Sequence, residues 1–253
     1  MNKTFFLGGL DLEMVEIKMR LKAAGATIQD RGLSWGAKAS AYSAEIAACL
    51  EAGATPVLVE LEIDVPLSPT VMVIDHHGNA SANPASLLQV LALLGVGPDR
   101  RALLVAANDT GGCFGLLSFE ASEAEIAQIL SEERAVQGFT SEMEAASQKA
   151  VSEAQYSSNL VVIRLPFSRF AAAKTTLWLK GHKNMVFIAE DGSGEVEFQG
   201  DGYGAKSIAK KFNANHPWSG GAGLGQSGRP DAYVGMYIST ADQLIEFVKN
   251  ELK

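Results

Sequence analysis

Short apolar runs alternate with helix-like segments through the first half of the chain, and this alternation constrains the fold more than any other feature. The runs are rich in β-branched or aromatic residues, as in strands buried on both faces, and span residues 4–10, 56–63 and 70–74. Segments with helical spacing follow them at residues 11–25, 42–53 and 86–94, and Asn83 and Pro84 are expected to open the last of these helices. The alternation predicts an α/β layer with a mostly parallel sheet.

The length of 253 residues, with 47% apolar residues, suits two domains. Between residues 118 and 158 the chain becomes rich in Ala, Glu, Ser and Gln, with a capping box at Ser122 and Glu125. Strands are expected again at residues 160–165, 185–189, 195–198 and 232–238, before a helix that starts near residue 240. We therefore predict a metal-binding α/β domain over 1–120, a helical linker over 121–158, and a smaller α/β domain over 159–253.

Charge and composition exclude several classes of function. The formal net charge of −8 argues against a broad basic face for long duplex nucleic acid. Two cysteines are too few for a disulfide scaffold or a Cys-rich zinc module. The apolar runs are all shorter than the 18 or so residues of a membrane span, so we expect a cytoplasmic protein without membrane contact.

Two of the four histidines stand together in the triplet Asp75-His76-His77, which follows directly on the apolar run 70–74. Open α/β sheets place their ligands at such strand ends. Histidine nitrogen together with carboxylate oxygen suits Mn²⁺, Zn²⁺ or Fe²⁺. The alternative is that the two histidines only cap a strand and hydrogen-bond a loop.

The triplet, followed by Pro-Ala-Ser-Leu-Leu at 84–88 and Ala-Asn-Asp-Thr-Gly at 107–111, resembles the DHH phosphoesterase superfamily. That family includes RecJ-like exonucleases, oligoribonucleases, cyclic-dinucleotide phosphodiesterases and manganese-dependent pyrophosphatases. The resemblance implies that His76 is a metal ligand supported by Asp75, which is itself counted among the metal ligands, and that His77 lies near the substrate phosphate. Asp75 and His77 would thus be the catalytic residues, and Asp109 a further metal ligand. The alternative for Asp109 is a residue of an Asx turn before Gly111.

The first motif of the family normally reads His-x-Asn-Pro-Asp-x-Asp, and here it is altered. Leu7 stands at the histidine position, Asp11 is kept, and Glu13 replaces the second aspartate. The resemblance implies Mn²⁺ or another divalent metal, one ion or two, with Asp11 and Glu13 among its ligands. The alternative for these two acids is that they only complement the dipole of their own helix.

A further acidic ligand is expected at the end of the second apolar run. Glu60, Glu62 and Asp64 are the candidates, and an alternating strand would place all three on one face. We predict Glu62 as the metal ligand, with Glu60 and Asp64 as the alternatives.

A glycine-rich segment precedes the last predicted strand, where the family carries a substrate-binding loop. Gly221, Gly223 and Gly225 would let backbone N–H groups approach a phosphate, and Arg229 could add a bidentate contact. A surface loop would look the same. Trp35 is expected to be a packing residue, with a base-stacking platform as the alternative.

These features predict a metal-dependent hydrolase that acts on phosphodiester bonds of short oligonucleotides or small nucleotides, with a homodimer as a candidate assembly. The competing hypothesis is a degenerate relative that binds a metal, a nucleotide or a protein partner without turnover. The two are distinguished by the first motif: catalysis is not expected if Asp11 and Glu13 point away from His76 with no acid from residues 60–64 between them.

Overall fold

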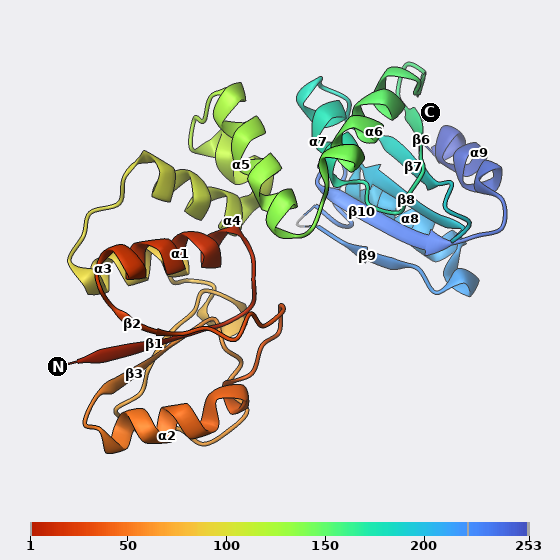
Figure 1. Ribbon diagram of the computed structural model, residues 1–253. Coiled ribbons are helices and arrows are strands. Elements are labelled where there is room, and N and C mark those ends of the chain that lie inside the picture. Colours follow the sequence, from red (N-terminus) through yellow and green to blue (C-terminus); the bar gives the residue numbers. More distant parts are fainter. Residues whose placement is uncertain (1, 222, 252–253) are drawn as a thin grey trace. The chain divides into compact units, whose positions relative to one another are not determined.

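The computed structural model describes residues 2–221 and 223–251, and the chain divides into two compact units, Met1–Gly138 and Phe139–Lys253 (Figure 1). Each unit contains its own sheet and helices. The predicted α/β class is therefore confirmed. In the part of the chain described, none of the helices combines the length and apolar character that a membrane crossing requires.

The first unit is built on a parallel sheet with the strand order β2-β1-β3-β4. Its strands are β1 Lys3–Leu7, β2 Thr27–Gln29, β3 Thr55–Val59 and β4 Met72–Ile74. Leu7 is in register with Val59, and Val59 with Ile74. The segments that follow these three strands therefore begin at one edge of the sheet, and they carry the predicted site residues.

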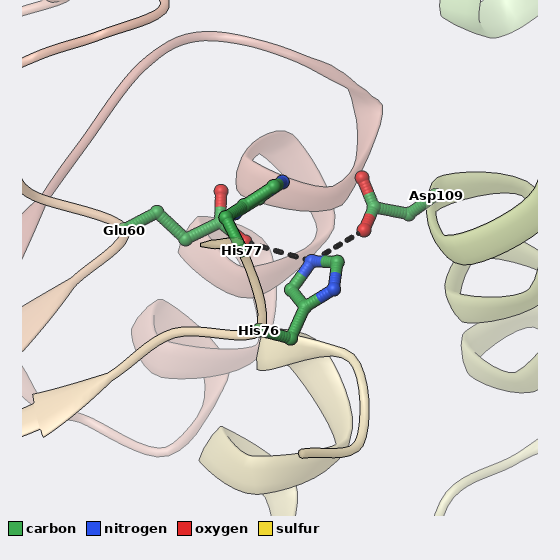
Figure 2. A group of neighbouring side chains, drawn as sticks. All are labelled: Glu60, His76, His77 and Asp109. Carbon is green, nitrogen blue, oxygen red and sulfur yellow. Dashed lines mark ion pairs between the residues drawn. The ribbon is translucent and has the colours of Figure 1, made fainter. Parts of the chain in front are cut away.

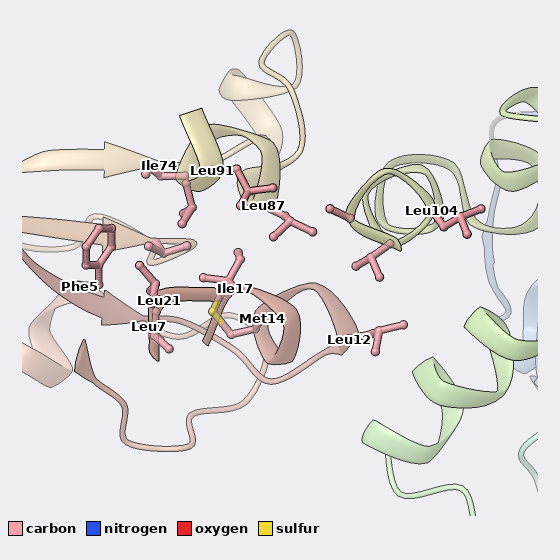
Figure 3. Packing of buried hydrophobic residues seen from close by; sticks show 14 of the residues in the cluster. Phe5, Leu7, Leu12, Met14, Ile17, Leu21, Ile74, Leu87, Leu91 and Leu104 are labelled. Carbon is pink, nitrogen blue, oxygen red and sulfur yellow. The ribbon is translucent and has the colours of Figure 1, made fainter. Parts of the chain in front are cut away.

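Helices cover both faces of this sheet (Figure 1). They are α1 Leu12–Ala23, α2 Ser43–Glu51, α3 Ser86–Leu94, α4 Arg100–Ser118 and α5 Glu123–Val136, with short 3-10 turns at Ala39–Tyr42 and Gly78–Ala80. Phe5 belongs to the hydrophobic cluster on the face packed by α1 and α3 (Figure 3), and Val57 belongs to the same cluster. Phe6 and Leu58 belong to the cluster on the face packed by α2. In β1 and β3 the period-2 alternation thus buries both faces, which explains why these two strands read as wholly apolar. In β4, Met72 and Val73 are exposed, so the expectation of a strand buried on both faces is wrong there.

Two further local expectations in this unit are wrong. Asn83 does not cap α3: the N-cap is Ala85, without a side-chain cap, and the Asn83 amide donates to the Asp75 carbonyl oxygen at 3.0 Å. Asp109 does not lie in an Asx turn. It is part of α4, whose helical geometry breaks only at Gly112 (φ 54°). The predicted capping box at the start of α5 is confirmed.

The second unit has a sheet of strand order β5-β6-β7-β8-β10-β9 in which only β6 and β7 pair in parallel. Its strands are β5 Gln155–Tyr156, β6 Val161–Leu165, β7 Met185–Ala189, β8 Glu195–Gly200, β9 Trp218–Gly220 and β10 Ala232–Tyr237. Its helices are α6 Ser141–Ser152, α7 Ala171–Leu179, α8 Gly202–Lys211 and α9 Ala241–Glu251, with a 3-10 turn at Asn213–Asn215. Two hydrophobic clusters fill this unit, one including α6 and α7 and the other α8 and α9.

Candidate metal centre

The segment between β1 and α1 brings two acids to the sheet edge. Asp11 is the N-cap of α1, and its Oδ1 accepts a hydrogen bond from the Met14 N–H at 2.7 Å. Glu13 lies in the first turn of α1 and is only 1% exposed. Its Oε1 accepts from the Leu87 N–H at 2.9 Å, so this carboxylate serves the N-terminus of α3 rather than that of its own helix. This contact explains why α3 needs no side-chain cap of its own.

The third acid, Glu60, follows directly on β3. It has a left-handed backbone (φ 52°), and its N–H donates to the Ile74 carbonyl at 2.9 Å. The turn lies directly against Gly8, where a Cβ atom would approach the Glu60 carbonyl oxygen to 2.1 Å. Glycine at position 8 is therefore required for Glu60 to take this position.

The left-handed residue breaks the strand alternation on which the choice among Glu60, Glu62 and Asp64 depended. The structure places Glu60 beside His76, whereas the Glu62 carboxylate is exposed and lies 3.9 Å from the Lys38 ammonium group. Asp64 accepts hydrogen bonds from the N–H and hydroxyl of Ser40. The three acids do not share one face because β3 ends at Val59.

His76 is the centre of the cluster (Figure 2). Its Nε2 lies 2.6 Å from Asp109 Oδ2, 3.3 Å from Glu60 Oε1 and 3.5 Å from Glu13 Oε2. All four of these atoms are buried, and none has a hydrogen-bond partner. One ligand atom each of Glu60, His76, His77 and Asp109 also lie within 4.8 Å of one another.

Burial and mutual repulsion perturb the protonation of this cluster. Burial, followed by the neighbouring Glu13 and Asp11 carboxylates, raises the pKa of Glu60 to about 8. Burial, followed by the Glu60 charge, raises the pKa of Asp109 to about 7. Glu13, followed by Asp109, raises the pKa of His76 to about 9. Burial also raises the pKa of Asp11. Acids held so close together are costly to ionise without a cation.

The donor set fits a divalent cation. Buried polar atoms that make no hydrogen bond are rare, because each loses its hydration without a hydrogen bond in return. Here four such atoms converge, three carboxylate oxygens and one imidazole nitrogen, which is the combination that suits Mn²⁺, Zn²⁺ or Fe²⁺. Leu7, at the position of the family histidine, is fully buried in the hydrophobic core and offers no donor.

Asp75 and His77 form a separate pair beside the cluster. The Asp75 Oδ1 lies 3.0 Å from His77 Nδ1 and accepts from the His77 N–H at 2.9 Å. The Asp75 carbonyl accepts in turn from the side chains of Asn83 and Gln89. The structure thus directs the Asp75 carboxylate to His77, whose half-exposed ring is tilted against that of His76 at 4.2 Å between centroids.

A pocket of about 300 Å³ opens beside the cluster. Asp11, Glu60, Glu62 and His77 contribute to its lining, and so does Trp35. The expectation that Trp35 is a packing residue is wrong, because 85% of it is exposed. Nothing in the hydrophobic pattern distinguished this tryptophan from a core residue.

The predicted substrate loop lies in the second unit, and the structure gives its glycines a packing role. A Cβ atom at Gly221 would lie 1.9 Å from the Asp231 carbonyl oxygen, and one at Gly223 would lie 2.2 Å from the Asp231 carboxylate. Gly225 has a positive φ of 82°. The Arg229 guanidinium is paired with Asp231 at 2.7 Å. Phosphate binding by these four residues stays a prediction.

Comparisons with known proteins support the fold. No family model matches the chain, and no curated protein matches it. Among solved structures, the pGpG-specific phosphodiesterase PggH from Vibrio cholerae matches with a TM-score of 0.52 at 12% identity, over 98% of each chain. An uncharacterized protein from Helicobacter pylori G27 matches with a TM-score of 0.27 at 11% identity, over 99% of this chain and 100% of that one. The chain therefore has a fold similar to that of a phosphodiesterase, with a cluster at one sheet edge that could hold a metal.

Proposed function

We propose that this protein is a metal-dependent phosphoesterase that hydrolyses phosphodiester bonds of short oligonucleotides or small nucleotides. The observation that carries the proposal is the convergence of four buried ligand atoms from Glu13, Glu60, His76 and Asp109, which make ion-pair contacts with one another and no hydrogen bond. The reaction class draws support from the fold shared with PggH, a pGpG-specific phosphodiesterase. A linear dinucleotide is within the substrate class that we propose.

Glu60, His76 and Asp109 would hold the ion, with Oε2 of Glu13 as the fourth donor. The chemistry that a divalent ion would supply there is activation of a water as nucleophile near neutral pH and compensation of the charge on the phosphoryl oxygens. The three carboxylate donors all lie around His76 Nε2, and Leu7 supplies no further donor, so the chain favours one strongly bound ion over two.

His77 is suited to contact the substrate phosphate. An ionised Asp75 carboxylate can only accept hydrogen bonds, so the proton of a neutral His77 ring resides on Nδ1. Its Nε2 is then free to accept a proton, and in the protonated ring to donate one to a phosphate oxygen. Asp75 fixes the tautomer and the ring orientation, which makes it a positioning residue.

The test uses hydrolysis of the dinucleotide pApA by the purified chain with Mn²⁺, and compares two neighbouring glutamates. Glu60→Gln is expected to abolish AMP release, as is His76→Ala. Glu62→Gln, whose carboxylate lines the same pocket but is exposed, is expected to keep activity within about twofold because an exposed ion pair contributes little. Equal activity of wild type and Glu60→Gln would refute the site assignment.

Calorimetric titration with Mn²⁺ separates turnover from binding. Metal binding that depends on Glu60, without hydrolysis of pApA, cyclic dinucleotides or pyrophosphate, would refute catalysis and favour a non-catalytic binding protein. This competing function shares the donor set, so only the hydrolysis assay decides between them.

A further inference from the structure

We infer that Trp35 is the stacking platform for a nucleobase of the ligand, which makes this protein select nucleotides over other phosphorylated molecules. The inference rests on the proposed function in one respect, that a phosphate binds at the candidate metal centre. It goes beyond that function because it assigns a residue to the recognition of the base.

The position of Trp35 is the first observation. The residue is 85% exposed, yet it lines the same pocket as Asp11, Glu60 and His77. Among the described residues its ring has no aromatic or cationic partner. A tryptophan this exposed to solvent lacks the stabilisation that a large aromatic side chain normally gains from burial. A ligand in the pocket would provide that burial.

The backbone that carries Trp35 is held at both ends, which is the second observation. On one side, the Leu10 N–H donates to the Leu33 carbonyl at 2.9 Å. On the other side, the Glu62 N–H donates to the Ala37 carbonyl, also at 2.9 Å. The segment 33–37 is thus fastened to the segments that carry Asp11 and Glu60.

Gly9 allows this close approach. A Cβ atom at position 9 would lie 2.8 Å from both the N and the Cα atom of Trp35. The two glycines at positions 8 and 9 therefore permit two different close contacts. Gly8 admits Glu60, and Gly9 admits the backbone of Trp35. Because the backbone is anchored, binding of a flat ligand has to order only the two side-chain torsions of the ring.

The charge of the pocket indicates what kind of ligand benefits. Asp11, Glu60, Glu62 and Asp75 all line it, so an anionic phosphate is repelled until a cation is bound. Stacking of a base on an aromatic ring adds affinity that does not depend on this charge, and it accepts any base because each has a π-face. The pocket therefore suits a phosphate that carries a base, with the phosphate at the cation and the base at Trp35.

The test compares AMP with ribose 5-phosphate, which carries the same phosphate without the base. Binding of each is measured by calorimetry in saturating Mn²⁺, for wild type, Trp35→Ala, Trp35→Phe and Trp218→Phe. Trp218 is a matched control, since it is a partly exposed tryptophan of the second unit that pairs with Tyr237 at 5.2 Å between ring centroids. Mn²⁺ affinity is measured alongside for all four proteins.

Trp35→Ala is expected to weaken AMP binding about tenfold, which corresponds to about 1.4 kcal/mol, and to leave ribose 5-phosphate and Mn²⁺ binding unchanged. Trp35→Phe is expected to stay within about threefold of wild type, because a phenyl ring still stacks. In pApA hydrolysis the alanine variant should raise KM about tenfold with kcat within twofold. AMP should quench tryptophan emission in wild type and in Trp218→Phe, but not in Trp35→Phe.

Unchanged AMP binding in Trp35→Ala would overturn the inference. So would an equal loss of AMP and ribose 5-phosphate, since the substitution would then act on the phosphate site, and so would a wild type that binds Mn²⁺ without binding AMP. AMP binding that depends on Trp35 in a protein that does not hydrolyse pApA would leave the platform in place and refute the proposed catalysis.

Discussion

Replacing Asp109 with Asn removes one charge from the buried cluster while keeping the side-chain shape. In the metal-free protein the Asp109 carboxyl has a pKa of about 7, against an ordinary value of 3.8, because it is buried near Glu60. Between these two pH values the folded state holds more protons than the unfolded state, so the Asp109 contribution to stability falls as the pH rises. The neutral variant should therefore be more stable than wild type, and its advantage should grow from about pH 4 to about pH 7 and stay constant above.

The size of the effect follows from the shift. About three pKa units correspond to about 4 kcal/mol, which is an upper bound because the side chain is 15% exposed and its neighbours can relax. We expect about 1–2 kcal/mol, or a rise in Tm of about 3–8 °C at pH 8 in EDTA. In Mn²⁺ at 100 times Kd the wild type should gain about 2.7 kcal/mol and the variant almost nothing, so the order of stability reverses.

The assay is thermal unfolding followed by circular dichroism, with and without Mn²⁺. Glu62→Gln is the control, since it removes an exposed carboxylate and should change stability by less than about 0.5 kcal/mol in either condition. A lower Tm for Asp109→Asn in EDTA at pH 8 would refute the reasoning. The attraction between Asp109 and His76 at 2.6 Å would then outweigh the repulsion among the acids.

Three further predictions concern the same centre. Glu13→Ala should destabilise the protein more than Glu13→Gln does, by about 1 kcal/mol of unfolding free energy, and should have the lower Tm. Only Gln can still accept the backbone hydrogen bond from the first turn of α3, and equal Tm values would contradict this cap. Gly8→Ala should lower Tm strongly and remove stabilisation by Mn²⁺, since its Cβ would lie 2.1 Å from the Glu60 carbonyl, whereas Gly97→Ala, with no neighbour within 4 Å, should do neither. Mn²⁺ affinity measured by calorimetry should tighten between pH 7 and 9, by up to about tenfold per pH unit for each proton released, because His76, with a pKa of about 9, and Glu60, with a pKa of about 8, must both lose their protons to bind; a flat profile would remove both residues from the donor set.

Much of the first unit was predictable because its signals are local. Short apolar runs identified β1, β3 and β4, and the triplet at 75–77 was correctly expected to follow a strand end. The parallel register of Leu7, Val59 and Ile74 then brings the loop segments together, as the rule for open α/β sheets predicts.

The details that the sequence could not supply depend on contacts across the fold. Glu60 rather than Glu62 lies beside His76 because a left-handed residue ends the alternation, and a single sequence gives no sign of that turn. Glu13 caps a helix that begins more than 70 positions later in the chain, which no local capping pattern reveals. The glycines at 8 and 9 were the available clue, because paired glycines after a buried strand indicate close backbone approach.

The most direct test of the central claim is a crystal structure of the protein soaked in Mn²⁺, with anomalous data that locate the ion. The account predicts one strong peak within coordination distance of Glu13 Oε2, Glu60 Oε1, His76 Nε2 and Asp109 Oδ2, at roughly 2.0–2.3 Å from each ligand atom. A peak at another group of residues, or no peak at this centre under conditions where the protein hydrolyses pApA, would contradict it.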